Sequence, residues 1–252
     1  MARISYDEQT AAAFKAVREV PRDGLSEWRE AVRRHLRPSQ RMTLVDIGAG
    51  TGAFAAAFSD WFGLNVLAVE PSAAMRDQIP RTPAIQVLEG NASALPMPDK
   101  SADAAWLSLV IHHIPDLGAA AQEIRRVLRP GAPVLIRQGF PGRIGRVELV
   151  RWFPETARAV DTYPSVAETR EAFATAGFHQ DALEQVRETY PASLADFLSQ
   201  ADTFRRADTT MRNLTEAEFL RGKDRLRRAV QRAEHTANPE TRSNWLDLLV
   251  LR

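Results

Sequence analysis

The segment around Gly48 limits the possible folds of this chain more than any other part of the sequence. An apolar stretch, Thr43 to Ile47, ends in Gly48-Ala49-Gly50-Thr51-Gly52, and the apolar stretch Ala53 to Phe62 follows with the length of a helix. A strand that turns through glycines into a helix lets a ligand approach the backbone, and the helix N-terminus offers free N–H groups to an anion. The segment therefore predicts a cofactor site in an α/β fold.

The glycine loop alone does not identify the cofactor. Either a dinucleotide pyrophosphate or a methionine carboxylate fits such a loop, and Gly48, Gly50 and Ala53 also satisfy the nicotinamide fingerprint G-x-G-x-x-G/A. Glu70 follows about twenty residues later, at the end of a second apolar run, where a carboxylate can accept both hydroxyls of an adenosine ribose. That feature is also common to both cofactor classes.

Short apolar runs alternate with helical stretches through the middle of the chain. A strand and a helix in turn produce right-handed crossovers, and hence a mostly parallel sheet with helices on both faces. A sixth strand is expected near Leu183 to Tyr190 and a last one at Asn244 to Leu251, which makes seven. The first five expected strands are Thr43 to Ile47, Val66 to Glu70, Ile85 to Leu88, Ala104 to Ser108 and Pro133 to Ile136.

Helical patterns surround this α/β core. Two amphipathic patterns, Asp7 to Glu19 and Leu25 to Leu36, precede the first strand, and a polar helical stretch from Ser193 to about Glu234 precedes the last. Ser165 and Thr215 each begin a capping-box signature. We expect N-terminal helices at residues 1–40 that cover the cofactor site, a core at 41–190 and 240–252, and a helical cap at 191–239 inserted before the last strand.

Composition excludes several classes of function. The formal net charge is +1, which argues against nucleic acid as an obligatory partner, and the chain has no cysteine for disulfides, thiolate metal sites or a thiol nucleophile. No apolar stretch is long enough to cross a membrane, and residues 1–20 lack the apolar core of a signal peptide. We expect a cytoplasmic monomer or homodimer with no metal, nucleic-acid or membrane partner.

The order of five motifs resembles the class I S-adenosylmethionine-dependent methyltransferases, in particular the "methyltransferase type 11" group that includes ubiquinone-pathway enzymes. The resemblance covers about Tyr6 to Ile136 and implies a Rossmann-like fold with S-adenosylmethionine as the methyl donor. It is carried by Val45 to Gly52, Val69-Glu70-Pro71-Ser72 with Met75, Gly90-Asn91-Ala92, Ser108 to His113, and Glu123 to Gly131.

The resemblance also implies roles for single residues. Glu70 would bind the ribose, and Pro71 and Met75 would pack on the adenine. Asn91 stands where the family usually has Asp, and an amide oxygen accepts a hydrogen bond more weakly than a carboxylate. The complete expected cofactor site is Tyr6, Asp46, Gly48, Ala49, Gly50, Gly52, Glu70, Pro71, Met75, Asn91, Ala92, Ser108 and Leu109.

His112 and His113 follow the fourth strand, whose carboxyl end should face the cofactor crevice. A histidine has a suitable pKa for a base that takes a proton from the acceptor, although it can also serve only to hold this loop. We expect the acceptor to be a small molecule, in the range of aromatic or polyketide-like metabolites. Trp152, Phe153 and Tyr163 could form a wall for it, or pack in the core. The sequence does not show whether O, N or C is methylated.

Two alternatives have different consequences. A nicotinamide oxidoreductase predicts a Tyr-x-x-x-Lys pair, but Tyr163 is followed by no lysine until Lys223. A protein of the same fold that binds S-adenosylmethionine without methylating, as a cyclase, chaperone or sensor, stays open because most of the motifs concern the cofactor and not the reaction. The arginine-rich stretch after Thr215 is expected to be a solvated helix face, with guidance of an anionic substrate as the other interpretation.

Overall fold

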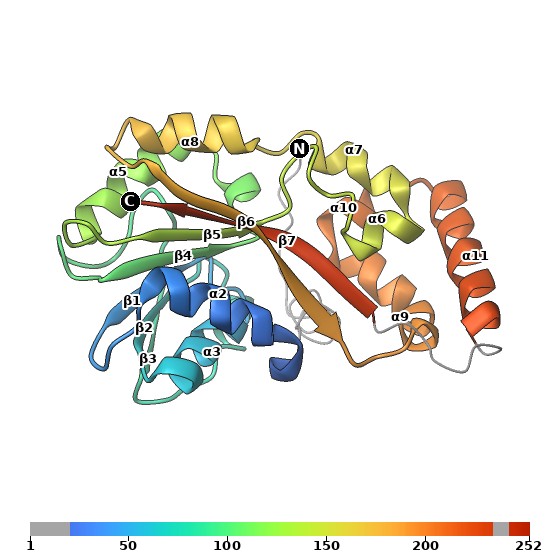
Figure 1. The fold of residues 1–252 in the computed structure, drawn as a ribbon, viewed down its shortest axis with the longest axis horizontal. Helices are drawn as coiled ribbons and strands as arrows, with labels where there is room; N and C mark the ends of the chain where they lie inside the picture. The colour runs from blue at the N-terminus through green and yellow to red at the C-terminus, as the bar shows by residue number, and fades with distance from the viewer. Residues whose placement is uncertain (1–20, 234–241) are drawn as a thin grey trace.

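Seven strands form one sheet in the order β3-β2-β1-β4-β5-β7-β6 in the computed structural model, which describes residues 21–233 and 242–252 (Figure 1). All neighbouring pairs are parallel except β5 with β7 and β7 with β6. This confirms the expected α/β fold with a mostly parallel sheet. The strands are β1 (Thr43–Ile47), β2 (Asn65–Val69), β3 (Ile85–Leu88), β4 (Ala104–Ser108), β5 (Val134–Gln138), β6 (Gln180–Tyr190) and β7 (Arg242–Leu251).

The register brings the carboxyl ends of the central strands to one edge of the sheet. Ile47, the last residue of β1, pairs with Val69 of β2 and Leu107 of β4, and Leu107 in turn pairs with Ile136 of β5. These strands are mostly apolar and buried because helices cover both faces of the sheet. The residues that follow each strand therefore lie close together.

Helices from different parts of the chain cover the two faces. The cluster around the buried Trp28 and Trp106 joins the sheet to η1 (Arg22–Leu25), α2 (Ser26–Leu36) and α3 (Ala53–Phe62). On the opposite face lie α5 (Leu117–Val127) and α8 (Val166–Ala174), in a separate apolar cluster (Figure 1). Two short elements, α4 (Ala73–Arg76) and η2 (Ile111–His113), follow β2 and β4 at the edge that carries the site.

The remaining helices lie beside the carboxyl end of β6 and the amino end of β7 (Figure 1). Apolar side chains from most of these helices form a cluster of their own, which includes Trp152, Phe153, Phe197 and Phe219. These elements are α6 (Glu148–Trp152), η3 (Pro154–Thr156), α7 (Ala157–Val160), α9 (Leu194–Ala207), α10 (Thr209–Arg212) and α11 (Glu216–Ala233). Among the described residues, no helix has the length and apolar character needed to cross a membrane.

Most of the expected elements are present, with different ends. The sixth strand begins at Gln180 instead of Leu183, and the last begins at Arg242 instead of Asn244. Both expected capping boxes form: Ser165 with Glu168, and Thr215 with Glu218. The expected helix Asp7 to Glu19 and Tyr6 lie outside the described residues.

Candidate active site

A cavity of about 770 Å³ follows the carboxyl ends of the central strands and continues beneath the helices that lie beside β6 and β7. Of the residues expected from the sequence, Gly52 does not line this cavity and Tyr6 is not described. The wall contains all the others: Asp46, Gly48, Ala49, Gly50, Glu70, Pro71, Met75, Asn91, Ala92, Ser108, Leu109, His112 and His113. Residues far apart in the sequence thus share one wall.

The glycine loop provides open space beside the backbone. A Cβ atom built on Gly50 would have no heavy atom within 4 Å, so a side chain there would occupy the cavity itself. At Gly52 a Cβ would lie 2.7 Å from Ile79 Cγ2, which shows that this glycine packs against the protein instead. The N-cap residue Gly52 supplies no side-chain cap to α3, and the N–H groups ahead of Ala55, whose amide donates to Asp46, therefore stay available to an anion.

Asp46 is a buried carboxylate at the end of β1. Its side chain is 2% exposed, and its Oδ2 has no hydrogen-bond partner among the described residues. Burial, together with the negative charge of Glu70, raises the pKa of Asp46 to about 8, although a hydrogen bond from the Ala55 amide opposes this shift. An uncompensated polar atom in a cavity wall is a position where a ligand can supply the missing hydrogen bond.

Glu70 connects the second strand to the glycine loop. Its Oε2 accepts a hydrogen bond from the Gly50 amide at 2.9 Å, and its Oε1 accepts one from the Ser72 amide at 2.9 Å. Burial raises the pKa of Glu70, although these two hydrogen bonds and the charge of Arg76 oppose the shift. Each carboxylate oxygen keeps a lone pair, so a diol can still be bound at this position.

The third expected motif forms a turn at the same end of the cavity. Asn91 is exposed, and its Oδ1 accepts a hydrogen bond from the Ser93 amide at 2.9 Å. That bond uses one lone pair of the amide oxygen on which the expected adenine contact depends. Met75 and Ala92 are buried, and Pro71 is exposed at the rim.

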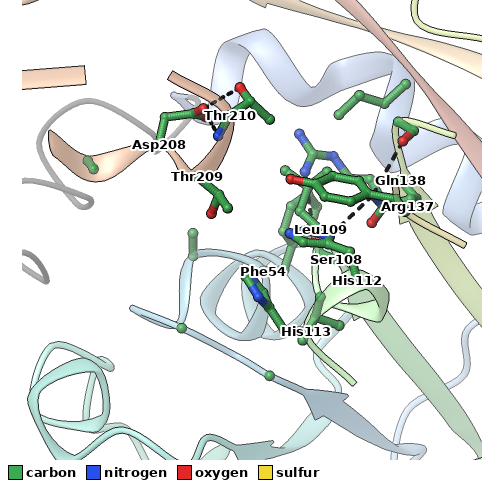
Figure 2. A pocket seen from close by; sticks show the side chains of 18 of the residues that line it. Phe54, Ser108, Leu109, His112, His113, Arg137, Gln138, Asp208, Thr209 and Thr210 are labelled. Atoms are coloured by element: carbon green, nitrogen blue, oxygen red, sulfur yellow. Dashed lines mark hydrogen bonds between the residues drawn. The ribbon is translucent and has the colours of Figure 1, made fainter. Parts of the chain in front are cut away.

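The two histidines lie on η2, and their surroundings differ. The ring of His112 is stacked on Tyr163, with centroids 4.0 Å apart and planes 10° apart, and its Nδ1 lies 3.4 Å from Gln138 Nε2. The ring of His113 is tilted by 46° to that of His112, with ring centroids 4.0 Å apart. Both rings border the cavity (Figure 2). Leu109, which precedes them, has a φ of +52°, a strained conformation for a branched side chain at the turn out of β4.

Several lining residues had no motif to indicate them. Arg137 and Glu188 form a buried ion pair, and Asp208, Thr209 and Thr210 face the histidines from the opposite side of the cavity (Figure 2). The one signal in the sequence was Arg137 itself, a charge within the apolar strand Val134–Gln138. The pairing with Glu188 joins positions too distant in the sequence to be associated by spacing.

The structure distinguishes between the interpretations of the aromatic and arginine-rich segments. Tyr163 lines the cavity, whereas Trp152 and Phe153 pack among the helices beside β6 and β7. The arginines of α11 contribute nothing to the described cavity wall. Arg225 donates to Glu155 and to the Trp152 carbonyl, and these contacts favour the solvated helix face over guidance of an anionic substrate.

The residues present fit S-adenosylmethionine, the cofactor implied by the resemblance. The open space at Gly50, the uncapped N-terminus of α3 and the unpartnered Oδ2 of Asp46 suit the zwitterionic amino-acid end of such a molecule. Glu70 suits a ribose. Within residues 21–233 and 242–252, no group of three or more His, Cys, Asp or Glu side chains is placed to hold a metal ion.

Comparisons with known proteins agree with this geometry. Residues 45–136 match a family model described as a methyltransferase domain. A malonyl-[acyl-carrier protein] O-methyltransferase of Yersinia pestis is 33% identical over 52% of this chain and 51% of its own length. A demethylmenaquinone methyltransferase of Renibacterium salmoninarum is 31% identical over 55% of this chain and 63% of its own length.

The chain thus spans about half to two thirds of the length of these curated relatives. A solved structure from Anabaena variabilis, named as a candidate methyltransferase of an antibiotic biosynthesis pathway, superposes with a TM-score of 0.72. It covers 93% of this chain and 98% of its own at 21% identity, which supports the fold. The family resemblance drawn from the sequence is confirmed over the glycine loop and the strands that follow it.

Proposed function

We propose that this protein, whose residues 45–136 form a methyltransferase domain, transfers a methyl group from S-adenosylmethionine to a small-molecule acceptor and releases S-adenosylhomocysteine. One observation carries the proposal: a single cavity joins the glycine loop, Glu70 and the two histidines. Its volume of about 770 Å³ lies within the range of about 300–1,000 Å³ that ligand pockets span.

In this proposal the cofactor lies at the ends of β1 and β2. Gly48, Ala49 and Gly50 allow close approach to the backbone, and Asp46 supplies the free oxygen for the ammonium group. Glu70 binds the ribose hydroxyls, and Met75 and Pro71 pack on the adenine with Asn91 and Ala92 beside them. Ser108 and Leu109 border the cofactor from β4, and Tyr6 is retained as an expected contact, whereas Gly52 shapes the loop from outside the cavity wall.

The cofactor, when bound, supplies an electrophilic methyl group on a sulfonium. The main task of the protein is then to align the acceptor atom with that methyl group, and positioning of this kind can contribute about 7–11 kcal/mol. An acceptor hydroxyl or ammonium must also lose a proton. His113 or His112 takes that proton, and a positioned base contributes about 10²–10⁴-fold.

The acceptor is proposed to be a small molecule bound between the histidines and the helices beside β6 and β7. Apolar side chains from these helices and from the loop after β5 suit an aromatic or similarly apolar body. We further propose that the protein is a cytoplasmic monomer or homodimer with no nucleic-acid or membrane partner, which its near-neutral charge supports. The division into N-terminal helices (1–40), core (41–190 and 240–252) and helical cap (191–239) is part of this proposal.

Calorimetric titration with S-adenosylhomocysteine and, separately, with NADH tests the proposal. We expect saturable binding of S-adenosylhomocysteine and none of NADH, because the carboxyl groups of Asp46 and Glu70 beside the loop suit an ammonium group and a ribose and disfavour the two negative charges of a pyrophosphate. Glu70→Ala should weaken S-adenosylhomocysteine by about tenfold or more, the size of lost hydrogen bonds to a charged group. Binding of NADH alone would contradict the proposed function.

A further inference from the structure

A buried ion pair lies in the cavity wall away from the glycine loop. Arg137 at the end of β5 donates from Nη2 to Glu188 Oε2 on β6, and their side chains are 6% and 1% exposed. The other oxygen of Glu188 accepts from the Tyr190 hydroxyl at 2.7 Å and from Asn244 Nδ2 at 2.8 Å. All four residues line the cavity.

Stability does not explain this pair. Burial of two charges costs about as much as their attraction returns, and apolar replacements of such pairs are often neutral or stabilising. Burial alone would raise the pKa of Glu188, but the charge and hydrogen bonds of Arg137, with those of Asn244 and Tyr190, keep that pKa below its usual value. Arg137 and Glu188 are therefore both ionised at the cavity wall, and their two charges cancel within the pair.

The other charged groups of the cavity wall disfavour the binding of an anion. Arg242 and Glu148 form a second pair, with nitrogen–oxygen distances of 2.8 and 2.9 Å. Among the described residues, five carboxyl groups and only two guanidinium groups line the cavity, and each guanidinium group is already paired with a glutamate. An acceptor carboxylate would lose its water beside Glu188 or Asp208 without a free cation to replace it.

The pair leaves hydrogen-bond donors for an uncharged oxygen. Ser108 Oγ accepts from Arg137 Nη1 at 3.0 Å, and its own proton has no acceptor among the described residues. Arg137 Nε also has no partner within the described chain. Apolar side chains continue the wall from this point: Ile144, Val147, Val150, Val160, Phe197 and Leu246.

We propose that the acceptor is an uncharged, mainly apolar molecule, with a neutral hydroxyl or carbonyl oxygen bound at Ser108, Arg137 and Glu188, and that carboxylates are excluded from this end of the cavity. The inference rests on the proposed function, because it assigns the space beyond the cofactor to an acceptor. In this inference the Arg137–Glu188 pair selects the acceptor, which accounts for a buried ion pair that stability does not explain.

The test uses three bicyclic probes of similar shape on the protein saturated with S-adenosylhomocysteine. At pH 7, 2-naphthol is neutral and 2-naphthoate is ionised, while 2-methylnaphthalene has no polar group. Equilibrium dialysis should show 2-naphthol bound about tenfold or more tightly than either of the others, which is the effect of one well-placed hydrogen bond to a charged group.

Two variants test whether the ion pair causes this preference. Glu188→Gln leaves the charge of Arg137 uncompensated, so 2-naphthoate should gain about tenfold or more. The double variant Arg137→Met/Glu188→Met removes both charges, so that no unpaired ion stays buried in the fold. In this variant 2-naphthol should bind no more tightly than 2-methylnaphthalene. Asp247→Asn is the matched control, because Asp247 is buried and paired with Arg143 but lies outside the cavity wall.

The outcomes distinguish failure of this inference from failure of the proposed methyltransferase function. If S-adenosylhomocysteine does not bind, the proposed methyltransferase function fails. If it binds but 2-naphthoate binds as well as 2-naphthol, or none of the probes binds, the inference alone is overturned. Unchanged probe preferences in both Arg137 and Glu188 variants would overturn it too.

Discussion

Asp46 lines the cavity beside the glycine loop with one oxygen unpartnered, and the negative charge of Glu70 acts on its carboxyl group. Its pKa of about 8 means that the folded protein without ligand holds a proton here at neutral pH. A bound ammonium group would favour the ionised form instead, because an opposite charge stabilises a carboxylate. Binding of an ammonium group at Asp46 should therefore release a proton from this side chain.

Substitution of Asp46 should change how stability depends on pH. The pKa is 3.8 in the unfolded chain and about 8 in the fold, so the folded state binds the extra proton between these values. The contribution of Asp46 to stability is therefore complete below pH 3.8 and is lost as the pH rises towards 8, by about 1 kcal/mol per pH unit. Asp46→Asn should remove this loss, as measured by urea unfolding at pH 5.5, 6.5 and 7.5.

Comparison with the wild type isolates the effect of this one group. The stability of Asp46→Asn relative to wild type should improve steadily from pH 5.5 to pH 7.5. A constant difference across this range would mean that Asp46 is ionised in the folded protein. Asp247→Asn controls for the removal of a buried carboxylate that already has a cationic partner.

His113→Ala separates catalysis from cofactor binding. The substitution should lower the turnover number by about 10²–10⁴-fold at saturating S-adenosylmethionine, because a positioned base is lost, while the affinity for S-adenosylhomocysteine stays within about twofold. The rates are measured with labelled cofactor and an acceptor that the wild-type protein methylates. His35→Ala is a suitable control, since His35 pairs with Glu184 away from the cavity. An unchanged pH profile of turnover would leave His113 only a structural role.

At the level of elements, α11 packs against the aromatic cluster through a glycine. A Cβ atom on Gly222 would lie 2.1 Å from Phe153 Cδ1, so the helix can approach this ring only without a side chain. Alanine favours a helix by about 1 kcal/mol over glycine, yet Gly222→Ala should destabilise the protein by about 1–3 kcal/mol through overpacking. Urea unfolding measures the sum of the two effects.

The sign of that change is informative. A gain in stability would show that Phe153 moves aside at little cost. Arg228→Ala, on the exposed face of the same helix, should change the free energy of unfolding by less than about 0.5 kcal/mol.

Elements with strong local signals were predictable from the sequence. The helix Ala53–Phe62 begins after a glycine and ends before Gly63, and the capping boxes at Ser165 and Thr215 form as expected. Strand ends were less predictable. The strand β6 begins at polar residues such as Gln180, which belong to the strand only because they pair with β7, a contact between segments distant in the sequence.

For the whole molecule, topology and cofactor end were predictable, and the acceptor end was not. The cofactor residues follow consecutive strands and therefore appear in the sequence as ordered motifs. The acceptor end combines Arg137 of β5, Glu188 of β6, Asn244 of β7 and Asp208 before α10, and no motif marks any of these residues in its own segment. Only the folded sheet brings them together.

The position of β7 between β5 and β6 has a consequence for how the chain reaches this structure. In the described sheet β6 pairs only with β7, and the helices α9, α10 and α11 are synthesised between these two strands. Until β7 emerges, β6 has no hydrogen-bonded neighbour in the sheet, and β5 has an open edge. Exposed strand edges attract other chains, so nascent protein paused within α11 is the species in which intermolecular strand pairing should begin.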